Sequence, residues 1–177
     1  MRLEPSGPSA DESFCTFTES IGLMTTPRPS AQSGAGVSDG KKLMEYLVGV
    51  LLAAVVCAFG RLVGFDRDRV FYPTLLIVIA TYYVLFAVMG SSTPALTIES
   101  LVAGGFCLLA VAGFKKNLWL VVAALAGHGV FDFFHHLFVH NPGVPVWWPG
   151  FCLSFDVPAS IFLAMLLVRR PGFTAAV

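Results

Sequence analysis

The chain has 177 residues, of which 56% are hydrophobic and 12% charged, and its mean hydropathy is +0.77. Soluble domains carry about 25% charged residues, so this composition excludes an ordinary soluble globular protein and indicates a membrane protein with several spans. Eleven basic residues balance eleven acidic ones, so the charge does not point to nucleic acid as a partner.

Residues 1–40 differ from the rest of the chain because they are rich in Ser, Pro, Gly and Thr and have no apolar period. Such a segment cannot bury enough apolar surface to fold, so we expect a disordered tail. It also lacks the basic start and apolar core of a secretory signal. Met24 and Met44 are alternative starts that would shorten or remove this tail. Residues 41–177 are expected to form a transmembrane helical domain.

Five apolar stretches follow the tail, and a helix needs about 20 mostly apolar residues to cross a membrane. Pro73 and the pair Thr93-Pro94 suit helix starts, whereas Asn141-Pro142-Gly143 suits a helix stop. The sequence therefore predicts an all-α bundle of about five transmembrane helices. The expected spans lie near residues 43–60, 73–89, 94–113, 118–139 and 150–168.

The loop charges predict an orientation, because short cytoplasmic loops carry an excess of Lys and Arg. One side of the predicted bundle has seven such residues, and the other has two, Lys41 and Lys42. The N-terminus is therefore expected outside and the C-terminus in the cytoplasm. The seven residues are Arg61, Arg67, Arg69, Lys115, Lys116, Arg169 and Arg170.

Ionisable side chains inside the spans are few, and they collect at one depth. Their cost within a membrane makes them markers of function. At 100° per residue, three of those in the span 118–139 share one helical stripe and the fourth lies about 80° away. With a rise of 1.5 Å per residue, the stripe, Glu99 and Asp156 lie about 8 to 18 Å from the same membrane face. The stripe is formed by His128, Asp132 and His135, and the flanking residue is His136.

Imidazole and carboxylate groups together suit a divalent metal such as zinc, iron or manganese. The candidate ligands are His128, Asp132, His135, His136 and Asp156. A catalytic zinc needs three protein ligands and an open position, and a nearby carboxylate can position or deprotonate its water. A hydrolase of a lipid or another apolar substrate is therefore one hypothesis. Its candidate catalytic carboxylates are Asp132, Asp156 and Glu99.

Two other functions remain open at this point. The same residues could relay protons or cations in a transporter, since His and Asp chains carry protons across membranes. They could also form hydrogen-bonded pairs that only hold the helices of a structural membrane subunit together. Tyr82 and Tyr83 either line a cavity or pack in the bundle. The lipid bilayer is an expected partner, and assembly into a homo-oligomer is an open alternative.

The block from Gly127 to His136, with the following Asn141-Pro142-Gly143, resembles a family of small bacterial polytopic membrane proteins of unknown function. Members of that family look like chains with four or five spans. They carry an H-x3-D-x2-H-H motif, a following Asn-Pro and an Asp early in the last span. The resemblance covers roughly residues 43–170. It implies a place in the bacterial inner (plasma) membrane and no defined reaction. The matching residues are His128, Asp132, His135, His136, Asn141, Pro142 and Asp156.

The sequence is more loosely similar to the membrane hydrolase superfamily that includes alkaline ceramidases. That superfamily combines Ser, Asp and His residues around zinc, which implies metal-dependent hydrolysis. It has more spans than the five expected here, and its His residues are divided between helices. In this sequence the His residues of the motif lie on one predicted helix.

Overall fold

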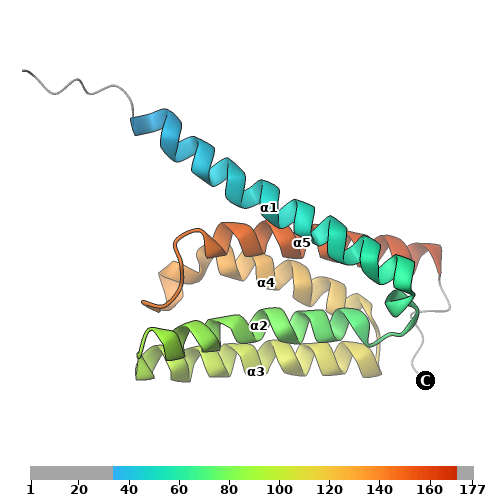
Figure 1. Ribbon diagram of the computed structural model, residues 1–177. Helices are drawn as coiled ribbons and strands as arrows, with labels where there is room; N and C mark the ends of the chain where they lie inside the picture. Colours follow the sequence, from blue (N-terminus) through green and yellow to red (C-terminus); the bar gives the residue numbers. More distant parts are fainter. Residues whose placement is uncertain (1–33, 171–177) are drawn as a thin grey trace, which may run out of the picture. The chain divides into compact units, whose positions relative to one another are not determined.

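The computed structural model describes residues 34–170, which form an all-α fold (Figure 1). All five α-helices are long and apolar enough to cross a membrane, so the predicted fold class is confirmed. Residues 1–33 of the expected tail, including Met24, lie outside the described part. The helices are α1 (Gly34–Val63), α2 (Phe71–Met89), α3 (Thr93–Lys115), α4 (Trp119–Phe138) and α5 (Trp148–Arg169), and a short 3-10 helix, η1 (Phe65–Arg67), follows α1.

The helix boundaries follow the predicted spans except at the start of α1. This helix begins at Gly34 rather than near residue 43, although its continuous apolar stretch starts only after Lys42. The difference arises because hydropathy marks the part of a helix that lies in hydrocarbon, and backbone hydrogen bonds can continue the helix beyond it. The Ser92 hydroxyl caps α3 by accepting a hydrogen bond from the Ala95 amide, with a proline in the first turn as expected.

Helix α5 lies between α1 and α4, and α2 pairs with α3, which also packs against α4 (Figure 1). Small residues permit the close approaches. A Cβ atom at Gly129 of α4 would lie 3.0 Å from the Cβ of Asp156 and 3.3 Å from the Cα of Leu153 on α5. At Gly49 of α1, a Cβ would clash with Ser154. These contacts hold the backbones of α1 and α4 close to α5.

Two ends of the bundle can be distinguished by their loops. Arg69, in the α1–α2 loop, donates a hydrogen bond to the carbonyl of Phe114 at the end of α3, over 3.0 Å. The α1–α2 and α3–α4 loops, which carry most of the basic residues, therefore share one end, called here the basic end. Arg61 also pairs there with the buried Asp66, at 2.9 Å. The opposite end, called the loop end, carries the α4–α5 loop (residues 139–147) and Trp148.

An apolar core fills the basic half of the bundle. Its buried members come from all five helices and include Leu76, Leu125 and Leu163. Burying these side chains between helices gives tight van der Waals packing, which is a main source of helix association within a membrane. The polar side chains described below lie on the other side of this core, toward the loop end.

The orientation of the bundle in the membrane stays a prediction, and cysteine labelling tests it. In a cysteine-free background, Val144→Cys should react with a membrane-impermeant thiol reagent added outside intact cells, because it lies at the loop end. Lys116→Cys, at the basic end, should react only after the cells are permeabilised. The reverse pattern would place the loop end in the cytoplasm.

Candidate functional site

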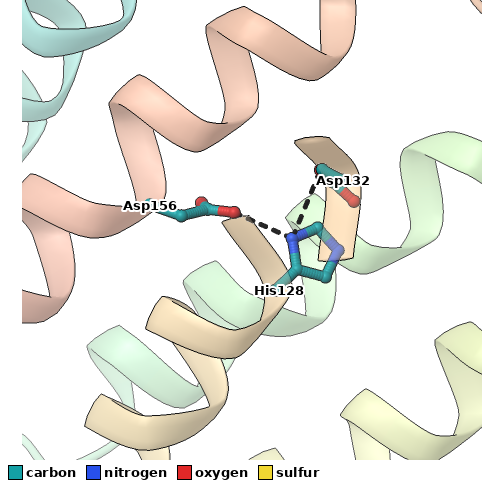
Figure 2. A group of neighbouring side chains, drawn as sticks. All are labelled: His128, Asp132 and Asp156. Atoms are coloured by element: carbon teal, nitrogen blue, oxygen red, sulfur yellow. Dashed lines mark hydrogen bonds and ion pairs between the residues drawn. The ribbon is translucent and has the colours of Figure 1, made fainter. Parts of the chain in front are cut away.

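Three ionisable side chains meet at the interface of α4 and α5, near the middle of the bundle (Figure 2). Nδ1 of His128 lies 2.8 Å from Oδ2 of Asp156 and 3.5 Å from Oδ2 of Asp132. His128 and Asp132 are one helical turn apart on α4, so they project from the same face. Asp156 reaches them from α5 beside Gly129, whose missing side chain lets the two helices approach. We call these three residues the central cluster.

The central cluster is closed to solvent. The relative exposure is 0% for Asp132 and Asp156 and 2% for His128. Both carboxylate oxygens of Asp132 and Oδ1 of Asp156 are buried without a hydrogen-bond partner. Burying a polar atom without a hydrogen-bond partner in hydrocarbon costs roughly several kcal/mol of free energy, and burying a bare carboxylate costs more. A further group, such as a proton or a cation, would satisfy these oxygens.

The geometry of the cluster fits a single metal ion. One ligand atom from each residue lies within 4.8 Å of the others. In a tetrahedral site with bonds of about 2.0 to 2.2 Å, ligand atoms lie about 3.4 Å apart, so small adjustments would suffice. One imidazole and two carboxylates also suit zinc, manganese or iron(II), and two negative charges balance a divalent cation. The described residues can therefore hold a metal there, but the ion's identity is open.

A second polar group lies closer to the loop end. Nε2 of His135 lies 2.7 Å from Oε1 of Glu99, which also accepts a hydrogen bond from Nδ2 of Asn141 over 2.9 Å. The same amide of Asn141 donates to the carbonyl of Tyr83, at 3.1 Å. All three side chains are buried. We call His135 and Glu99 the outer pair, and Asn141, which bonds to Glu99 and to Tyr83, the clasp. Together they connect α4, α3, α2 and the α4–α5 loop.

Tyr83 lies between the two polar groups. Its ring packs against the His135 imidazole, with ring centroids 4.3 Å apart and the planes tilted by 35°. Its hydroxyl is buried without a hydrogen-bond partner, and its side chain is a close neighbour of Asp132. Cys152 of α5 is also a neighbour of Asp132, and Phe106 of α3 packs edge-on against His128 at 4.7 Å. Aromatic walls therefore hold both imidazoles in place.

A cavity of about 530 Å³ opens at the loop end and reaches the outer pair. His135 and Asn141 form its inner wall. Asp132 precedes His135 by less than one turn of α4, which corresponds to a rise of about 4.5 Å along the axis. The central cluster thus lies just beyond the end of a cavity that opens on one side only of the apolar core. The other lining residues are Lys42, Glu45, Tyr46, Phe133, His136, Val139, His140, Val144, Pro145, Val146, Pro149 and Gly150.

The predicted site residues divide between these places. His128, Asp132 and Asp156 come together as a potential metal site, whereas His135 pairs with Glu99 instead. His136 is exposed, lines the cavity and does not join either group.

The sequence indicates Asn141 only as a helix stop and as part of the family motif, and it gives no signal that Cys152 lies at the site. The Asn-Pro pair after the His-rich helix does not predict the clasp by itself. The partners of Asn141 lie on α2 and α3, so their positions must be known first.

Comparisons with protein families, with curated proteins and with solved structures found no match for this chain.

The outer pair should contribute measurably to stability. Replacing Glu99 by Gln puts an amide opposite His135 and Asn141, so the protein should lose about 1 to 3 kcal/mol of unfolding free energy. Glu45→Gln is the matched control, because Glu45 is only partly buried at the cavity wall. Thermal unfolding in detergent measures both. Equal unfolding temperatures for the two variants would contradict a stabilising role of the pair.

Proposed function

We propose that this integral membrane protein binds one divalent metal ion at His128, Asp132 and Asp156 and uses it to hydrolyse a lipid or another apolar substrate. The observation that carries the proposal is that both buried Asp132 oxygens accept no hydrogen bond although they lie beside His128 and Asp156 (Figure 2). A divalent cation would neutralise two carboxylates at once, and three protein ligands leave a position open, as in catalytic zinc sites.

The chemistry would be the addition of water across an ester or amide bond, which yields an acid and an alcohol or amine. A metal held by His128, Asp132 and Asp156 would supply a Lewis acid and would lower the pKa of a water molecule. One of the two cluster carboxylates would accept the proton of the attacking water and return it to the leaving group. His135 lines the cavity and is hydrogen-bonded to Glu99, so this pair can exchange a proton with water in the cavity.

The apolar core makes a transmembrane proton or cation relay the less favoured function. A relay needs polar groups or water along the whole path. On the basic side of His128, the buried side chains of the described helices are mainly apolar and include Leu76, Leu125 and Leu163. The Ser160 hydroxyl is already bonded to the carbonyl of Val157 in its own helix. Access from one end only suits a reaction site better than a conduit.

The family resemblance stays a prediction, and it carries no reaction of its own. It agrees with the proposal in the residues that it singles out, because His128, Asp132 and Asp156 all belong to its motif. The likeness to alkaline ceramidases agrees in the use of His and Asp around a metal, but the ligand set proposed here has a single His.

Metal content tests the proposal most directly. The purified wild-type protein, reloaded with zinc, manganese or iron(II), should bind about one equivalent of metal. Asp132→Asn keeps the shape but removes the charge, so its affinity should fall by more than about tenfold while the protein still inserts and folds. Asp68→Asn, in the exposed α1–α2 loop, should bind metal normally.

Elemental analysis and thermal unfolding are measured on the same samples. Asp132→Leu is included as a second variant. If Asp132 were purely structural, this variant would lower the unfolding temperature and leave the metal content unchanged. Normal metal content in Asp132→Asn, or no metal in the wild type with any of the three ions, would defeat the proposal.

Proton flux separates the proposal from the relay. Vesicles containing the purified protein and a pH-sensitive dye should dissipate an imposed pH gradient no faster than protein-free vesicles, because the apolar core blocks the path from His128 to the basic end. A faster flux that disappears in His128→Asn would favour the relay instead.

A further inference from the structure

The cavity at the loop end lies between helices that do not pack on each other. Helices α1 and α4 lie on either side of α5, and the described residues show no extended contact between them. In Figure 1 the first turns of α1 diverge from the rest of the bundle. One wall of the cavity comes from the N-terminal half of α1, through Lys42 and Tyr46. Another comes from the last turns of α4, through Phe133 and His136. A lipid could therefore reach it sideways, from the bilayer, as well as from the loop.

The cavity's polar rim is mainly basic. Lys42, His136 and His140 line it, and Lys41 lines the smaller pocket beside it. Glu45 is the one carboxylate among the lining residues. An ammonium group and imidazole N–H groups are suitable donors to phosphate oxygens. The rim is thus complementary to an anionic group, although the chain as a whole carries no net charge.

The position of the cavity suits a lipid headgroup. Trp147 is 45% exposed at the end of the α4–α5 loop, and Trp side chains prefer the membrane–water boundary. Lys42 lies near the start of the apolar part of α1. Below this level the two helices expose apolar side chains near the cavity side, where acyl chains can lie. Val50 of α1 is about 40° around its helix from Tyr46, and Val130 of α4 is about 60° from Phe133.

We infer that the cavity binds a membrane lipid with an anionic phosphate headgroup, which enters sideways between α1 and α4. The phosphate lies among Lys42, His136 and His140, and the lipid's linkage region extends toward His135. The inference deepens the proposed function, on which the role of this lipid as substrate rests. Binding of the lipid itself requires no metal, so the two can be tested apart.

Lipid selectivity tests this inference. The full-length protein is placed in bilayers of equal amounts of phosphatidylglycerol and phosphatidylcholine with identical chains, then extracted in mild detergent, and the retained lipids are counted by native mass spectrometry. The wild type should retain phosphatidylglycerol preferentially. Lys42→Gln should lower the ratio about fivefold, since a cation near an anionic membrane surface contributes about 1 kcal/mol. The double variant Lys42→Gln/His140→Gln should lower the ratio further.

Lys116→Gln is the matched control, because it removes the same charge at the basic end, outside the cavity. An unchanged ratio in this variant supports the cavity as the binding place, and an equal loss would assign the preference to general surface charge and overturn the inference. No preference in the wild type overturns it as well. Inorganic phosphate is added as a competitor, and complete displacement of the lipid by it would assign the cavity to free phosphate instead.

Metal content is measured on the same samples, which separates the two proposals. Selective lipid retention in a protein that binds no metal would support the lipid site and defeat the metal-dependent reaction. A normal metal content without lipid selectivity would leave the metal site standing and overturn the lipid site alone.

Discussion

A carboxylate inside a membrane must be paired, protonated or bound to a cation, and much of this structure follows from that constraint. Asp132 and Asp156 lie at the centre of the bundle with no solvent exposure, and His128 is within ion-pair distance of both. Breaking such a buried arrangement by removing one partner leaves an uncompensated charge, which is strongly destabilising. The close packing of α4 on α5 at Gly129 is what brings Asp156 to the other two residues.

The polar and apolar halves of the bundle have complementary roles. The half toward the loop end contains two linked polar groups that connect α2, α3, α4, α5 and the α4–α5 loop. The half toward the basic end is an apolar core that holds the same helices by packing. An apolar half packed against a half with buried polar groups is an arrangement that can hold ionisable side chains in a fixed geometry.

The sequence predicted the helices well because hydropathy and length determine membrane spans. Helical periodicity also placed His128 and Asp132 together correctly. It put His135 in the same group, yet α3 lies on that side of α4 and Glu99 takes His135 as its partner. Angles on one helix cannot reveal which neighbour faces each position. The clasp by Asn141 was beyond prediction for the same reason, since a loop amide finds its partners only after α2 and α3 have packed.

The packing of α1 on α5 bears on how the protein is made. Among the described spans, α1 has the latest one in sequence, α5, as its main partner, so α1 must wait in the bilayer without that partner until α5 has been synthesised. Asp156 arrives with that same last helix, so His128 and Asp132 are inserted before their third companion exists. Assembly of this small bundle is therefore long-range in sequence despite its short loops, and a quality-control protease or insertase would meet an open groove between α1 and α4 until α5 fills it.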